Sequence, residues 1–346
     1  MHRAQLPLTR PFSSIMGIRE DEVVRKISFS VQRGREGSDR VLLGVGDDTA
    51  LFRPRLGHEL LLTCDWFLEG THFLPDKHPP DSIGWKCLAR AMSDIAAMGG
   101  IPRCFLLSLA LPPSDTGRWL DEFLTGLRRA SHRFQCVLAG GDTTRGNKTL
   151  INVTVVGEVR RGRSILRSGA RPGDIVFVSG RLGEAELGLQ ILKRNKRGAH
   201  SKDSLLKKHL YPEPRIALGR WLAEKCLATS MMDISDGLSA DLPRLCAASD
   251  VGARINATKI PALPISSRGG LRAIDPLRLA LHGGDDYELL FTVRPKHAKS
   301  FPRSVGSVPL TRIGVVTSEK QIVLVDVNGR EKRLESAGWD PFRSLS

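Results

Sequence analysis

Acidic residues beside glycine or at the ends of apolar runs recur along the chain and carry its strongest chemical signal. One such cluster can equally be a turn or the N-cap of a helix. Several carboxylates together are a typical Mg²⁺ site, and neighbouring glycines let backbone N–H groups approach phosphate oxygens. We therefore expect a site for Mg²⁺ and phosphate groups. The clusters are Gly46-Asp47-Asp48, Asp65, Ser93-Asp94, Gly140-Gly141-Asp142-Thr143-Thr144, Asp233-Ile234-Ser235-Asp236-Gly237 and Gly283-Gly284-Asp285-Asp286.

Hydrophobic periodicity predicts the elements that must position these clusters. Apolar runs over 41–45 and 60–64 are predicted to be strands that end at acidic residues. An apolar stripe over 84–98 predicts a helix, and Gly99-Gly100 would end it. The first half is thus mixed α/β. Further strands are expected over 105–111, 137–139, 151–159, 174–179, 229–232 and 288–293, and further helices over 118–134, 183–192, 214–225 and 238–248.

Asp94 has two interpretations. It lies roughly opposite the apolar stripe of its predicted helix and four residues after Arg90, which allows an exposed ion pair. However, Cys87, Ala91 and Ala97 share its face and are small. That composition favours a second packed or ligand-facing surface.

Length, charge and cysteine content narrow the class of protein. The 346 residues suggest two domains, and the net charge of +15 indicates anionic ligands or partners. A basic nucleic-acid-binding protein stays a remote alternative, although two tyrosines and the lack of basic-aromatic interleaving argue against it. Apolar runs are too short to cross a membrane. Six cysteines without a CxxC pair fit a reducing cytoplasm and indicate neither zinc nor disulfides.

Several other enzyme classes lack their motifs here. The sequence contains no GxxxxGK[ST] phosphate loop, no HRD catalytic loop, no HExxH and no GxSxG. Gly44-Val45-Gly46 lacks the third glycine of a dinucleotide fingerprint, which argues against a nicotinamide enzyme.

Six motifs, in order and in register, resemble the thiamine-monophosphate kinase family from about Gly17 to Phe342. That family belongs to the superfamily of aminoimidazole ribonucleotide synthetase. The resemblance implies a two-domain fold of class α/β + α+β, with an N-terminal mixed sheet that pairs across a homodimer. The motifs are Gly46-Asp47-Asp48-Thr49-Ala50, Thr63-Cys64-Asp65 with Glu69-Gly70-Thr71-His72-Phe73, Met92 to Gly99, Gly140 to Gly146, Asp233 to Leu238 and Gly284 to Leu289.

Three segments are expected along the chain. Residues 1–16 are predicted to be a disordered tail. Residues 17–162 would form an N-terminal α/β domain for metal binding, ATP binding and dimerisation, and 163–346 a C-terminal α+β domain. The basic residues 193–208 are predicted to be a solvated insertion, with an anion-recruiting patch as the alternative.

The resemblance also implies an activity and a site. The activity is ATP-dependent phosphorylation of thiamine monophosphate to thiamine diphosphate, the last step of thiamine diphosphate biosynthesis, with several Mg²⁺ ions. The implied metal ligands are Asp48, Thr63, Cys64, Asp65, Asp94, Asp142, Asp233 and Asp236. The implied ATP contacts are Asp48, Gly141, Asp142, Arg167 and Ser235, and the implied contacts to thiamine monophosphate are His72, Asp285 and Trp339.

No general base or covalent nucleophile is expected. The acceptor is itself a phosphate monoester, whose second pKa is near 6, so it is largely dianionic at neutral pH. The carboxylates would therefore be metal ligands, and catalysis would consist of aligning two polyanions and screening their repulsion.

The chain departs from the family pattern at four points. Cys64 stands where a hydroxyl residue is usual, so a metal contact there would come from the backbone. Asp285 replaces a glutamate and Ala91 an asparagine, and the surplus of basic residues is unusual. Selenophosphate synthetase-like and aminoimidazole ribonucleotide synthetase-like activities remain alternatives.

Overall fold

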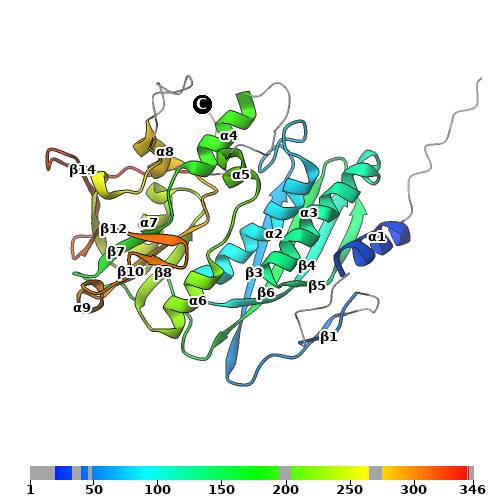
Figure 1. Ribbon diagram of the computed structural model, residues 1–346, viewed down its shortest axis with the longest axis horizontal. Helices are drawn as coiled ribbons and strands as arrows, with labels where there is room; N and C mark the ends of the chain where they lie inside the picture. The colour runs from blue at the N-terminus through cyan, green and yellow to red at the C-terminus, as the bar shows by residue number, and fades with distance from the viewer. Residues whose placement is uncertain are drawn as a thin grey trace, which may run out of the picture.

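The computed structural model describes residues 20–32, 40–45, 49–194, 204–264, 275–340 and 342. The predicted tail at 1–16, the proposed ligand Asp48 and positions 195–203 of the basic stretch lie outside these residues. In Figure 1 the N-terminal half, with its sheet and helices, lies at the right, and the C-terminal half lies at the left.

A mixed four-stranded sheet forms the centre of the N-terminal half, in the order β3-β6-β4-β5. β3 (His58–Leu68) and β4 (Ile101–Leu111) both pair antiparallel with β6 (Leu150–Arg160), and β5 (Val137–Arg145) runs parallel to β4. Helices α2 (Pro80–Ala97) and α3 (Arg118–Phe134) lie along this sheet in Figure 1. Apolar side chains that alternate along β4 and β6 form the core beneath them.

Helix α2 is buried on almost every side. It packs against α3, β3 and β6, and against α6 (Ile216–Glu224) and β8 (Ala228–Ile234) of the C-terminal half. Cys87, Ala91 and Ala97 are buried, which confirms the second packed surface that the sequence predicted. Gly126 of α3 permits the close approach of α3 to α2, because a Cβ at Gly126 would lie 1.7 Å from the Asp81 carbonyl oxygen. Helix α2 therefore contacts both halves of the chain.

The opposite face of the N-terminal sheet carries exposed apolar side chains. Leu60, Leu62 and Trp66 of β3 are 46%, 70% and 54% exposed, and Leu106 of β4 is 37% exposed. An apolar sheet face of this kind is typical of a surface that meets a partner.

The C-terminal half is built on a mixed, mainly antiparallel sheet in the order β14-β13-β9-β12-β7-β10-β8, with β11 paired to β12. Its outer strands include β14 (Glu331–Arg333), β13 (Ile322–Val325), β9 (Gly252–Asn256), β12 (Val308–Thr317) and β11 (Ser304–Val305). Its central strands β7 (Ile175–Ser179) and β10 (Glu288–Val293) are buried throughout. One face packs against α7 (Leu238–Ala248) and the other against α6 (Ile216–Glu224). The fold class, α/β followed by α+β, agrees with the sequence prediction, and the expected boundary at 162/163 falls between β6 and β7.

The remaining elements connect or extend these layers. No helix of the described residues is long and apolar enough to span a membrane. The other helices are α1 (Glu20–Gln32), α4 (Glu184–Arg194), α5 (Ser204–Leu210), α8 (Pro276–His282) and α9 (Pro295–Ala298), with 3₁₀ turns η1 (Pro113–Asp115) and η2 (Ala257–Lys259). The other strands are β1 (Val41–Leu43) and β2 (Leu51–Phe52).

Candidate active site

Strand β3 and helix α2 bring the first predicted site residues together. Thr63 and Asp65 lie between the apolar residues Leu61 and Phe67 on the face of β3 that is turned toward α2. The Thr63 hydroxyl donates a hydrogen bond of 2.5 Å to Asp94 Oδ2 on α2. Asp94 is therefore turned into the molecule, and the described residues contain no ion pair between Asp94 and Arg90. The exposed ion pair considered from the sequence is wrong.

Asp233, in β8, joins this group from the C-terminal half. Ser93, the neighbour of Asp94 in α2, donates a hydrogen bond of 2.7 Å to Asp233 Oδ2. Burial, followed by the nearby Asp94 charge, raises the pKa of Asp233 to about 8. Burial also raises the pKa of Asp94, and it raises the pKa of Asp65 to about 6 although Arg90 opposes the shift. Carboxylates from three elements thus repel one another in buried surroundings, which a bound cation would relieve.

The turn after β8 holds Ser235 and Asp236. Asp241 Oδ2 accepts hydrogen bonds from the backbone N–H groups of Ser235 at 3.1 Å and Asp236 at 3.0 Å. Arg244 donates to Asp236 Oδ2 at 2.5 Å and to Asp241 Oδ1 at 2.7 Å. Neither Asp241 nor Arg244 was predicted from the sequence, although both lie on α7 within nine residues of Asp236. Their contacts fix the shape of this turn.

His72 and Trp339, both expected to contact thiamine monophosphate, lie close together. Their ring centroids are 5.5 Å apart, and His72 also stacks on Phe67 at 5.8 Å. The backbone N–H of Leu68 donates to His72 Nδ1 at 3.0 Å, and the backbone N–H of Trp339 donates to the Asp236 carbonyl oxygen at 3.0 Å. Burial, reinforced by the Arg90 charge, lowers the pKa of His72 to about 4. This histidine is therefore neutral at pH 7.

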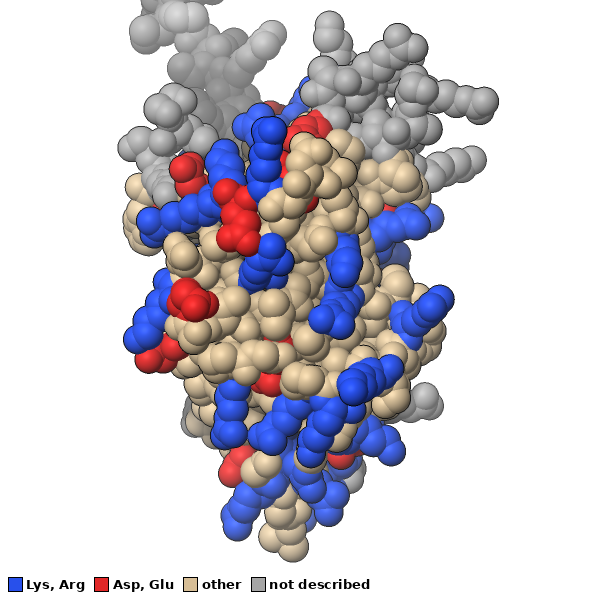
Figure 2. Space-filling model, turned by 90° about the vertical axis from the view of Figure 1, so that its left-hand side faces the viewer, with Lys and Arg blue, Asp and Glu red and all other residues tan. Residues whose placement is uncertain are grey.

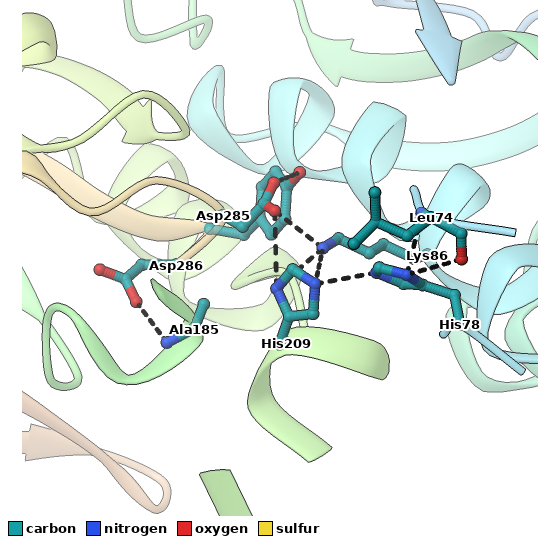
Figure 3. A network of polar contacts seen from close by, with 8 residues as sticks. Leu74, His78, Lys86, Ala185, His209, Asp285 and Asp286 are labelled. Carbon is teal, nitrogen blue, oxygen red and sulfur yellow. Dashed lines mark hydrogen bonds and ion pairs between the residues drawn. The ribbon is translucent and has the colours of Figure 1, made fainter. Parts of the chain in front are cut away.

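Asp285 is held by Lys86 of α2, as Figure 3 shows. Lys86 Nζ lies 2.8 Å from Asp285 Oδ2, and the Tyr287 hydroxyl donates to Asp285 Oδ1 at 2.7 Å. Burial alone would raise the pKa of Asp285, but the Lys86 ammonium outweighs it and holds the pKa well below its usual range. Asp286, in contrast, accepts the Gly183 and Ala185 N–H groups at 2.7 and 3.3 Å at the start of α4. Asp286 is thus a structural cap.

Two buried histidines extend this network and were not selected from the sequence. His209 of α5 lies 3.3 Å from Lys86 Nζ through its Nδ1, and its Nε2 lies 3.0 Å from His78 Nε2 (Figure 3). Because the Lys86 ammonium only donates, neutral His209 carries its proton on Nε2 and donates to His78 Nε2. Neutral His78 then carries its proton on Nδ1 and donates to the Leu74 carbonyl oxygen at 3.3 Å, so Nδ1 does not accept from the Leu74 N–H, which lies 3.1 Å away. Burial, followed by the Lys86 charge, lowers the pKa of both histidines.

The spacing of polar residues along α2 could have indicated its site residues from the sequence. Lys86, Arg90 and Ser93 are spaced by four and three residues, so they lie on one face of the helix, with Asp94 beside them. This polar stripe on a helix that is otherwise buried marks a surface directed at a site.

Three predicted residues do not join this group. Cys64 faces the uncovered side of the sheet, where its Sγ lies 3.2 Å from Asn152 Nδ2. Asp142 of β5 pairs with Ser108 of β4, Ser108 pairs with Asn152 of β6, and Asn152 pairs with Trp66 of β3. Paired residues share a face of the sheet, so the exposed Asp142 lies on the uncovered face with Trp66, opposite to the face that carries Asp65. At Gly141, a Cβ would lie 1.9 Å from the Leu107 carbonyl oxygen, so β4 and β5 require glycine there.

Arg167 is exposed. Burial raises the pKa of Asp94, and the Thr63 hydrogen bond and the Arg167 charge oppose this shift only in part. The acidic site thus belongs to a protein with a net charge of +15. On the face that Figure 2 shows, Lys and Arg side chains outnumber Asp and Glu.

The carboxylate oxygens of Asp65, Asp94 and Asp233 are donors of the type that a hard cation such as Mg²⁺ prefers. Among the described residues, no three Asp, Glu, His or Cys side chains converge closely enough to hold a metal ion. Burial first, and then the charges of neighbouring carboxylates, raises the pKa values of Asp65 and Asp233. Oxygen donors with excess negative charge fit Mg²⁺.

Two family matches cover most of the chain. Residues 46–159 match the N-terminal domain of AIR synthase related proteins, and residues 171–327 match the C-terminal domain of the same proteins. Thiamine-monophosphate kinase from Escherichia coli K12 is 40% identical over 306 residues, covering 87% of this chain and 92% of the relative. The Bacillus subtilis thiamine-monophosphate kinase is 34% identical over 310 residues, covering 87% and 94%.

Solved structures give the same result. The thiamine-monophosphate kinase of Stenotrophomonas maltophilia K279a superposes with a TM-score of 0.76 at 36% identity and covers 90% of this chain and 96% of its own. The structure of AaThiL complexed with AMPPCP and TMP superposes with a TM-score of 0.73 at 32% identity, covering 94% and 99%. The hydrogenase maturation protein HypE shares the fold at 20% identity. With identities of this size over nearly the whole length, the chain belongs to the thiamine-monophosphate kinase family.

Proposed function

We propose that this protein transfers the γ-phosphoryl group of ATP to thiamine monophosphate and so forms thiamine diphosphate. One observation carries the proposal. In a chain of this family, Thr63 of β3 is hydrogen-bonded to Asp94 of α2, its neighbour Ser93 is hydrogen-bonded to Asp233 of β8, and the His72 and Trp339 rings lie 5.5 Å apart. The related structure that holds AMPPCP and TMP together supports the same pair of substrates.

The residues divide into two groups by chemistry. Thr63, Asp65, Asp94, Asp233 and Asp236 would hold Mg²⁺, which when bound supplies positive charge to the phosphate oxygens. Asp48, Asp142 and the Cys64 backbone were also expected to be metal ligands. Asp142 lies on the sheet face opposite to Asp65, so these two carboxylates would not hold the same ion, and Asp48 lies outside the described residues. Gly141, Arg167 and Ser235 would contact ATP.

The thiamine side is formed by neutral rings and one charged group. His72 and Trp339 would pack against the flat rings of thiamine, and Asp285 would face its polar groups. The acceptor phosphate is already largely dianionic, so the described residues need only bind and align it.

A homodimer is part of the proposal. The exposed apolar face of β3 and β4 supports it, because a second copy packed there would remove Leu62 and Trp66 from water. β4 has neighbours on both sides, so it cannot extend the sheet across a dimer, whereas β3 is an edge strand. All six cysteines are free thiols, which supports a cytoplasmic location.

The test is a direct assay of the purified protein with ATP, Mg²⁺ and thiamine monophosphate. We expect one thiamine diphosphate for each ADP formed. ADP release without thiamine diphosphate would favour another activity of the superfamily. Salt-dependent retention on DNA without kinase activity would favour a nucleic-acid-binding protein.

A further inference from the structure

Arg90 lies among the carboxylates of the site, and within the described residues its guanidinium has no hydrogen-bond or ion-pair partner. It stands on α2, one turn after Lys86 and one turn before Asp94. Its Nε is buried and makes no hydrogen bond, and within the described residues its guanidinium forms no ion pair. The guanidinium carbon lies 5.4 Å from the centre of the Phe67 ring. A buried guanidinium ordinarily engages a carboxylate or phosphate with its planar set of donors.

Three of the four neighbouring carboxylates are already engaged by other groups, and Asp65, the fourth, forms no ion pair with Arg90 among the described residues. Asp285 is bound by Lys86 and Tyr287, Asp236 by Arg244, and Asp94 by Thr63. These contacts leave the donors of Arg90 for a ligand. The Phe67 ring holds the guanidinium in place through a cation–π contact without consuming its donors.

The electrostatic neighbours of Arg90 belong to both halves of the proposed site. Burial opposes its charge, but Tyr287, Asp65, Asp285 and Asp236 outweigh burial and raise the pKa of Arg90. In return, Arg90 helps to lower the pKa of His72. Asp65 and Asp236 are proposed metal ligands, whereas His72 and Asp285 are proposed thiamine contacts. Arg90 therefore lies where the two groups of residues meet.

We propose that Arg90 binds the phosphate group of thiamine monophosphate, the group that accepts the phosphoryl. This inference rests on the proposed function. In that reaction the acceptor phosphate is the part of the substrate that must lie between the thiamine rings and the metal-bound ATP. A guanidinium can bind two phosphate oxygens at once and so can fix the direction of the attacking oxygen.

The experiment compares Arg90→Gln and Arg90→Lys with the wild-type protein. We expect Arg90→Gln to raise the KM for thiamine monophosphate by about 10- to 100-fold and to leave the KM for ATP within about twofold. Arg90→Lys should recover only part of the loss, because an ammonium lacks the planar fork. The matched control is Arg118→Gln, since Arg118 is 92% exposed on α3 and pairs with Glu122.

Equilibrium binding separates recognition of phosphate from a structural role. By calorimetry without ATP, Arg90→Gln should weaken thiamine monophosphate and leave thiamine, which has no phosphate, unchanged. Equal weakening of both ligands would overturn the inference, as would an unchanged KM for thiamine monophosphate in both variants. A KM for ATP that rises as much as that for the acceptor would assign Arg90 to the γ-phosphate and also overturn it. A wild-type protein that forms no thiamine diphosphate would instead remove the proposed function.

Discussion

Lys86 and Asp285 form an ion pair of 2.8 Å that joins helix α2 to the loop before β10. The two residues are 199 positions apart, and the Lys86 side chain is only 1% exposed. Two neutral histidines lie on the other side of Lys86, so Asp285 is its one anionic contact among the described residues. This pair connects the two halves of the protein at the edge of the active site.

Replacing Lys86 with methionine should destabilise the fold. Breaking a buried ion pair leaves Asp285 without its counter-charge, and we expect a loss of about 3–5 kcal/mol in the free energy of unfolding. Urea denaturation measures this loss. The control is the double variant Lys86→Met with Asp285→Asn, which should lose less than the sum of the two single variants. Additive losses would show that the pair contributes nothing.

Asp65→Asn and Asp233→Asn should separate activity from stability. Each removes a proposed Mg²⁺ ligand, so kcat/KM should fall by more than about 100-fold. Because burial and neighbouring carboxylates raise the pKa values of both residues, the amides should leave stability in Mg²⁺-free buffer unchanged or higher. Thermal unfolding and the kinase assay check both statements, with the exposed Asp121→Asn as control. Retained activity in both variants would contradict the metal assignment.

His78 should make the protein less stable as the pH falls below 7. Its pKa is about 4 in the folded protein, against about 6.5 in the unfolded chain. Between these values the unfolded chain binds the proton and the folded protein does not, so unfolding becomes easier as the pH falls through this window. Relative to wild type, His78→Gln should gain about 2 kcal/mol between pH 7 and pH 5. Urea denaturation at both pH values measures the difference.

The control for this prediction is His132→Gln, in the exposed last turn of α3. An unchanged difference between His78→Gln and wild type at the two pH values would show that His78 is not held neutral.

The uncovered sheet face should form the dimer. We expect light scattering to give the mass of two chains at micromolar concentration, and Leu62→Glu to shift the protein to monomers by placing a charge in the interface. Val327→Glu is the control, because Val327 is 79% exposed on the C-terminal half. A wild-type monomer under these conditions is incompatible with the proposal.

Gly126→Ala should destabilise the contact between α2 and α3. The added Cβ would meet the Asp81 carbonyl oxygen at 1.7 Å, and such overpacking costs about 1–3 kcal/mol or more. Gly117→Ala, just before α3, meets nothing within 4 Å and is the matched control. Equal melting temperatures of the two variants would contradict the close packing.

Acidic residues at strand ends could be predicted from the sequence, and the structure links Thr63 to Asp94, and Ser93 beside it to Asp233. The sheet face on which Asp142 lies could not be predicted from the sequence. A bulge between Phe105 and Leu106 shifts the pairing of β4 with β5, and one residue of register decides which face a side chain occupies. That shift leaves no mark in the sequence.

The partners of Asp285 were also beyond sequence analysis. Lys86 and His209 come from α2 and α5, and nothing local to either segment indicates that they meet. Arg90 and Asp94 were four residues apart on one predicted helix, so a local ion pair was a reasonable alternative. The two residues do not pair in the folded protein, because Asp94 accepts a hydrogen bond from Thr63 and Arg90 lies over the Phe67 ring.

Lys86, Arg90, Ser93 and Asp94 of helix α2 each contact a residue on another element, and the helix is buried on almost every side. An inserted or deleted residue near its start would rotate everything that follows by about 100°. All four side chains would then leave their partners in a single event, and no shift of the helix along its axis could restore them. Length changes in this family should therefore be tolerated in the connection between β6 and β7 and be absent from α2.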